Sequence, residues 1–147
     1  MEDYEHIVCG IDFSPLSEAA CARAIHLSHQ TGAQLTLLHV VEYFPEDRSN
    51  EIIAPELSDP AAYRESHARK GLTELAKRLG CENAAQEVVF TPHAAWHALV
   101  RFAGSQGADL VVVGCHGHHG VAVLIGSTAN GVLNRSPCDV LAVRPHS

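Results

Sequence analysis

The sequence is poor in lysine and has no long apolar run. Lys70 and Lys77 are its only lysines, and 10 basic residues stand against 17 acidic ones, so the formal net charge is -7. A nucleic-acid surface needs clustered cations to neutralise phosphates, whereas the basic residues here are scattered along the chain. No apolar run approaches the roughly 20 residues that cross a bilayer. We therefore expect neither a nucleic-acid partner nor a membrane segment.

The sequence also lacks a paired-cysteine motif and a basic leader. Its 5 cysteines include no C-x-x-C pair, and an odd number without that pairing is typical of reduced thiols. The first residues, MEDYEHIV, are acidic where a secretory leader would be basic. We expect a cytoplasmic protein in which Cys9 and Cys138 are small core residues within strands.

The length and the composition fit a single globular domain. The chain has 147 residues, of which 46% are hydrophobic and 18% charged, a balance typical of soluble domains that bury a core. Internal repeats, low-complexity tracts and linker-like segments are absent from the sequence. We therefore expect residues 1–147 to form one domain.

Short apolar runs alternate with segments of helical periodicity. The apolar runs predict strands at His6 to Ile11, Gln34 to Val41, Gln86 to Phe90, Ala108 to Gly114 and Pro137 to Val143. The periodic segments predict helices at Leu16 to Thr31, Pro60 to Gly80, Ala94 to Gly104 and Ser127 to Asn134. Because a helix connects each strand to the next, the fold class is α/β, with a five-stranded parallel sheet and helices on both faces.

The stretch from Asp109 to Asn130 carries the clearest functional pattern. An apolar strand ends at a glycine, a glycine-punctuated loop follows, and a helix begins. The loop reads Gly114-x2-Gly117-x8-Gly126-Ser127, followed by Thr128. Backbone N–H groups and the positive end of a helix dipole favour an anion in this arrangement. We interpret it as a phosphate-binding loop; the alternative is that the glycines only permit tight turns.

Other residues are expected to meet this loop at one edge of the sheet. Ligands of open α/β sheets lie beyond the carboxyl ends of the strands. Asp12 follows the first predicted strand, and Val40 and Val41 end the second. Asp12 has a second interpretation as a helix cap or turn residue, which needs no ligand.

These segments together resemble a known family. IDFSPLSEAA near the start, LLHVV in the second strand, the glycine loop and the terminal PCDVLAV resemble the universal stress protein (UspA-like) family over essentially the full length. The resemblance is to its nucleotide-binding branch, and it implies a Rossmann-like, flavodoxin-like sheet with strand order 3-2-1-4-5. That branch carries ATP on a G-x2-G-x9-G-[ST] loop. The second spacing is one residue shorter here, and Thr91-Pro92-His93 stands where the family tends to carry Gly-x-Pro.

The resemblance implies roles for individual residues. Asp12 would contact the ribose or a metal such as Mg²⁺, and Val40 would flank the adenine. The phosphates of ATP, or of ADP or AMP, would be held by Gly114, Gly117, Gly126 and Ser127, with Thr128 as an extra donor. Dimers of the resembling family pair their terminal strands, and Cys138 to Val143 would do so here.

Histidine is abundant, at 11 residues. Three of them, His116, His118 and His119, fall within the glycine loop, where imidazoles could donate to phosphate oxygens. Such donation strengthens as pH falls through about 6.5, so nucleotide affinity is expected to rise modestly from about pH 8 to about pH 6. His93 and His97 are spaced for one helix face and could bind zinc or copper. We favour solvent-facing side chains there and predict no metal site.

The sequence therefore favours a nucleotide-binding, stress-response regulatory protein. We find no placed general base for an attacking water and no nucleophile with a partner beside it. Catalysis is left open, with slow ATP hydrolysis as the most that Mg²⁺ held by Asp12 would support. The alternative is a dimeric interaction module whose nucleotide site is empty or vestigial.

Overall fold

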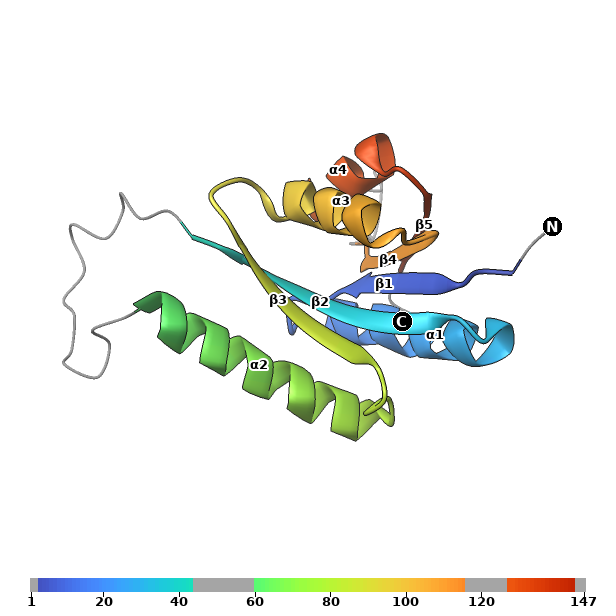
Figure 1. Cartoon of the computed structure of the whole chain (residues 1–147), viewed down its shortest axis with the longest axis horizontal. Helices are drawn as coiled ribbons and strands as arrows, with labels where there is room; N and C mark the ends of the chain where they lie inside the picture. The colour runs from blue at the N-terminus through green and yellow to red at the C-terminus, as the bar shows by residue number, and fades with distance from the viewer. Residues whose placement is uncertain (1–2, 44–59, 116–126, 145–147) are drawn as a thin grey trace, which may run out of the picture.

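Five parallel strands pair into one sheet in the order β3-β2-β1-β4-β5 (Figure 1). The computed structural model describes residues 3–43, 60–115 and 127–144. The strands are β1 (His6–Gly10), β2 (Gln34–Glu42), β3 (Ala85–Thr91), β4 (Leu110–Gly114) and β5 (Asp139–Val143). The predicted fold class and strand order are confirmed. Reversal of the strand order at β1 places a topological switch point between β1 and β4.

Four helices cover the two faces of this sheet. They are α1 (Pro15–Thr31), α2 (Pro60–Leu79), α3 (Ala95–Gln106) and α4 (Ser127–Arg135). Helices α1 and α2 lie below the sheet in Figure 1, and α3 and α4 lie above it. No helix within the described ranges is long and apolar enough to cross a membrane.

Local sequence signals set the ends of α1. The Ser14 hydroxyl accepts a hydrogen bond from the Ser17 amide at 3.2 Å, and Pro15 opens the helix. Gly32 ends it at φ 77°, in the left-handed region, with its amide bonded to the Ser28 carbonyl. Both ends lie within one residue of the helix predicted at Leu16 to Thr31.

The structure moves the predicted starts of two elements, β5 and α3. Strand β5 begins at Asp139, because the Ser136 hydroxyl donates to the Cys138 carbonyl and accepts from the Cys138 amide, which holds a turn there. Helix α3 begins at Ala95, because Ala94 is extended at φ -65° and ψ 151°. His93 therefore precedes α3, and of the histidine pair only His97 lies on the helix.

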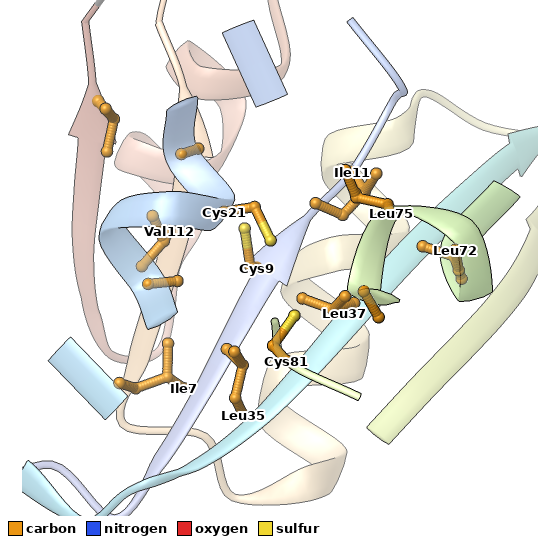
Figure 2. Close-up of a cluster of buried hydrophobic side chains, with 14 of the residues drawn as sticks. Ile7, Cys9, Ile11, Cys21, Leu35, Leu37, Leu72, Leu75, Cys81 and Val112 are labelled. Atoms are coloured by element: carbon orange, nitrogen blue, oxygen red, sulfur yellow. The ribbon is translucent and has the colours of Figure 1, made fainter. Parts of the chain in front are cut away.

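The face covered by α1 and α2 is filled by small and branched side chains (Figure 2). Leu37 and Leu72 are fully buried there and come from β2 and α2. Burial of one such side chain contributes about 1.5–3 kcal/mol to the free energy of unfolding. In β1, Cys9 lies in register with Leu37 and Val112.

Three cysteines take part in this packing. Figure 2 shows the sulfur atoms of Cys9 and Cys21 directed toward one another, with Cys81 nearby. A hydrogen bond with Cys21, together with burial, raises the pKa of Cys9 well above its ordinary value, and burial raises the pKa of Cys81 to about 11. The raised pKa values make the Cys9 and Cys81 thiols poor nucleophiles, whereas the hydrogen bond with Cys9 lowers the pKa of Cys21. The core role predicted for Cys9 is confirmed, whereas Cys138 lies outside the strand and is only partly buried.

Candidate functional site

A cavity of about 290 Å³ lies at the carboxyl ends of β1, β2 and β4. The segment after β1 and the end of β4 form its floor, and Leu38, Leu99 and Val113 form an apolar wall. The starts of α1, α3 and α4 complete it, through Ser14, Ala95 and residues 127–129. This is the crevice at the switch point of the sheet, where open α/β folds bind their ligands.

The cavity brings together five of the residues that the sequence singled out. They are Asp12, Val40, Gly114, Ser127 and Thr128. The other three candidate residues, His116, Gly117 and Gly126, lie outside the described residues. The nucleotide role of all eight stays a prediction.

Asp12 is held by the turn that follows β1. Its Oδ1 accepts hydrogen bonds from the Ser14 amide at 3.0 Å and from the Ser14 hydroxyl at 2.5 Å. Partial burial by itself would raise the pKa of Asp12, but hydrogen bonds from Ser14 and Ser17 outweigh it and lower that pKa below its ordinary value. The cap of α1 is Ser14 and not Asp12, and Asp12 holds the turn that precedes the helix.

Phe13, the middle residue of this turn, has a left-handed backbone with φ 66°. Such a conformation costs a residue with a side chain about 1–2 kcal/mol. Asp12 and Ser14, on either side of Phe13, both line the cavity. No signal in the sequence indicates this conformation, because left-handed positions usually carry glycine, asparagine or aspartate.

Gly114 has a packing role that the sequence did not reveal. A Cβ atom built on it would lie 2.9 Å from both the Leu16 carbonyl oxygen and the Leu16 Cγ. Its φ is not in the left-handed region, so close approach of α1 to β4 is what requires glycine here. Because Leu16 also lines the cavity, this approach helps to set its width.

The helix starts at the cavity favour an anion, whereas the Asp12 carboxylate repels one. Three helices begin at the cavity, and each contributes the positive end of a dipole, although the Ser17 amide of α1 is already bonded to Ser14. Ala94, the cap residue of α3, offers the first-turn N–H groups of that helix no side-chain acceptor. Asp12 is the only ionisable side chain among the described lining residues. Backbone and hydroxyl groups therefore provide the polar contacts, in line with the scarcity of lysine.

The histidine pair lies away from this cavity. His93 and His97 meet with ring centroids 4.9 Å apart and line a separate surface depression beside Arg101. Within the described part of the chain, no group of three or more histidine, cysteine, aspartate or glutamate side chains could hold a metal ion. The pair therefore contributes nothing to the candidate site.

Comparisons with known proteins agree on one family. A sequence model of the universal stress protein family matches residues 3–144. Universal stress protein A homolog 1 of Coxiella burnetii is 37% identical over 140 residues, which cover 95% of this chain and 96% of that protein.

Solved structures of universal stress proteins are also similar to this chain. UspA from Lactobacillus plantarum has a TM-score of 0.73 at 23% identity, covering 98% of this chain and 100% of that one, and this likeness shows the fold. A universal stress protein crystallised in complex with cAMP is 29% identical, with a TM-score of 0.68, covering 99% of this chain and 100% of that one. The chain therefore belongs to the universal stress protein family.

Proposed function

We propose that this protein is a regulatory protein that binds an adenine nucleotide, with ATP as the first ligand to test. The observation that carries the proposal is the cavity at the switch point, which joins Asp12, Val40 and the start of α4 at Ser127. The relative that was crystallised with cAMP supports adenine as the base and phosphate as the anion.

The chemistry of the cavity suits the parts of such a ligand. Val40 and Leu99 offer apolar surface for the flat faces of a base, and the Asp12 carboxylate can accept hydrogen bonds from ribose hydroxyls. The helix start at Ser127 and Thr128 suits phosphate oxygens. Gly117, Gly126 and His116 remain sequence predictions for the phosphate contacts.

A magnesium ion fits this set of groups. Mg²⁺ bound with a nucleotide takes one or two carboxylates and completes its coordination with phosphate oxygens and water. Asp12 is ionised at neutral pH, because its pKa is lowered, and it can serve as that carboxylate. A bound ion would neutralise phosphate charge, which the lysine-free lining does not.

Regulation by binding is favoured over turnover. The Asp12 carboxylate is engaged with Ser14, and no second ionisable side chain lines the described part of the cavity to serve as a general base. We propose that any ATP hydrolysis is slow compared with nucleotide release. The cytoplasmic location stays a prediction.

Calorimetric titration with ATP and Mg²⁺ tests the proposal. Asp12→Ala is expected to weaken binding by about tenfold or more, because a hydrogen bond to a charged group contributes about 1.5–3 kcal/mol. Gly117→Val should abolish binding if its backbone approaches the phosphates. Glu74→Ala, an exposed carboxylate on α2, is the matched control and should bind as the unmodified protein does.

Three results would each contradict a different part of the proposal. No binding of ATP, AMP or cAMP by the unmodified protein would refute the nucleotide proposal. Binding that is equal in the unmodified protein and Asp12→Ala would remove Asp12 from the site. Binding that is unchanged by chelation with EDTA would remove Mg²⁺ from it.

The edge strand β5 favours a second role, as a dimeric module. Among the strands of the described residues, β5 pairs only with β4, and Val140, Leu141 and Ala142 in its centre are partly exposed. An apolar edge strand is a template for pairing with another chain. We propose a homodimer through Cys138 to Val143, with the cavity either filled or vestigial.

Light scattering at micromolar concentration tests this pairing. Val140→Lys should convert the dimer to a monomer, because a charge on the edge strand opposes pairing. Gln86→Lys on β3, the opposite edge of the sheet, is the control and should leave the dimer intact. A monomeric unmodified protein would refute the dimer.

A further inference from the structure

Phe13 holds a strained backbone while its side chain is partly exposed. It is the only non-glycine residue with positive φ among residues 3–43, 60–115 and 127–144. Its side chain is 38% exposed, so deep burial does not account for its conformation. A bulky residue persists at positive φ where the surrounding structure holds it in place, and such residues gather at functional sites.

Two elements of the structure hold the Phe13 ring. Its centroid lies 4.6 Å from that of the His39 ring in β2, with the ring planes tilted by 39°. Its far edge lies against Gly71 in α2, where an added Cβ would be 2.9 Å from both Cε1 and Cζ of Phe13. Gly71 therefore leaves the space that the ring occupies.

The residues on both sides of Phe13 are tied as well. The His39 Nδ1–H donates to the Ile11 carbonyl oxygen at 2.7 Å. Asp12 accepts two hydrogen bonds from Ser14, which caps α1. The turn from Ile11 to Ser14 is thus fixed to β2, to α1 and, through Phe13, to α2.

These contacts lie behind the wall of the cavity. Asp12 and Val40 line the cavity, whereas their sequence neighbours Phe13 and His39 do not. Phe13 therefore acts on a ligand only through the residues beside it. Helix α2 contributes no residue to the cavity, and the contact of Gly71 with Phe13 is one of its links to the cavity. Ile11 provides another, because it lines the cavity and packs in the same core as Leu72 and Leu75 of α2.

We propose that Phe13, held between His39 and Gly71, is a positioning residue that fixes the Asp12 carboxylate toward the cavity and couples α2 to it. The inference that this affects nucleotide affinity rests on the proposed function. A substitution in α2 that moves the Phe13 ring should then alter ligand binding in the cavity, although the substituted residue does not line the cavity.

Gly71→Ala tests the positioning without any ligand. The added methyl group displaces the ring, and the loosened turn weakens the hydrogen bonds from Ser14 that lower the pKa of Asp12. Carbon-13 NMR titration of the Asp12 carboxyl should therefore show a higher pKa in Gly71→Ala than in the unmodified protein. Gly104→Ala in α3 is the matched control, since its Cβ meets only Pro137 Cγ, at 3.8 Å, and its Asp12 titration should not change.

Nucleotide affinity adds a second measurement. Gly71→Ala should weaken ATP binding by about threefold to tenfold, the size of typical long-range coupling. Phe13→Gly should weaken it to a similar extent, because the turn loses its clamp. In the Phe13→Gly background, Gly71→Ala should have no further effect, since the ring that it displaces is gone. Circular dichroism checks that each variant is folded.

The results distinguish this inference from the nucleotide proposal. An Asp12 titration that is unchanged by Gly71→Ala, or additive effects of the two substitutions on affinity, would overturn the positioning role. A shifted titration in a protein that binds no nucleotide would refute the proposed function and support the positioning of Asp12.

Discussion

The two faces of the sheet differ in how completely they are packed. Among the described residues, 19 buried side chains form the core under α1 and α2, whereas 10 form the core under α3 and α4. Most of the apolar wall of the cavity, including Leu38, Leu99 and Val113, belongs to the smaller core. Within the described part of the chain, the larger core therefore lies under α1 and α2, and the cavity is bordered mainly by the smaller one.

Leucine truncations on the two faces should have the largest effects and test this difference directly. Leu72 is fully buried under α2, so Leu72→Ala should lower the free energy of unfolding by about 2–5 kcal/mol. Leu99→Ala should fall near the lower end of that range, about 2 kcal/mol, because Leu99 already borders a cavity. Urea denaturation measures both losses.

The same two variants should differ in ligand binding. Leu99→Ala is expected to change nucleotide affinity, because it removes part of the cavity wall, whereas Leu72→Ala in its folded state is not. Equal losses of stability with equal effects on binding would contradict the division of roles between the faces.

The next largest effect on stability is expected from a substitution at the contact between α3 and α4. A Cβ on Gly131 would lie 2.2 Å from Trp96 Cγ, so the indole of α3 rests directly on the backbone of α4. Overpacking of this kind costs about 1–3 kcal/mol, and Gly131→Ala should lower stability by that amount. Trp96 is the only tryptophan of the chain, so its fluorescence reports the displacement directly.

A helical glycine elsewhere provides the control for this prediction. Gly104→Ala adds a methyl group that makes ordinary contact and removes backbone freedom from the unfolded chain, so stability should stay level or rise slightly. If Gly131→Ala behaved like Gly104→Ala, the close packing of α3 on α4 would be refuted.

Protonation of Asp12 should have the smallest effect. Its pKa lies below the ordinary 3.8 in the folded protein. The ionised carboxylate therefore stabilises the fold fully above the unfolded pKa, and this contribution is lost as pH falls through the lower, folded value. Between about pH 4 and about pH 2, the unmodified protein should lose more stability than Asp12→Asn, which titration by circular dichroism would detect. If the stability of the two proteins fell in parallel over this pH range, the prediction would be contradicted.

Prediction from the sequence succeeded where the signal is local. Alternating apolar runs and helical patterns predicted the nine described elements. Parallel connections then brought Asp12, Val40 and Ser127 to one cavity, as expected from the rule for open α/β sheets. Prediction failed at Pro137, where hydrogen bonds between Ser136 and Cys138 delay the start of β5, and it placed the start of α3 one residue early, at the extended Ala94.

By itself, the sequence determined the fold class, the strand order through its family resemblance, and the residues expected at the carboxyl edge. Only the tertiary structure decided that Phe13 is left-handed, that Gly71 makes room for its ring, and that Gly114 lets α1 approach β4. The physical reason is distance along the chain. Periodicity and capping depend on neighbours within a few residues, whereas the space that an aromatic ring fills is defined by elements far apart in sequence, which meet only once the chain has packed.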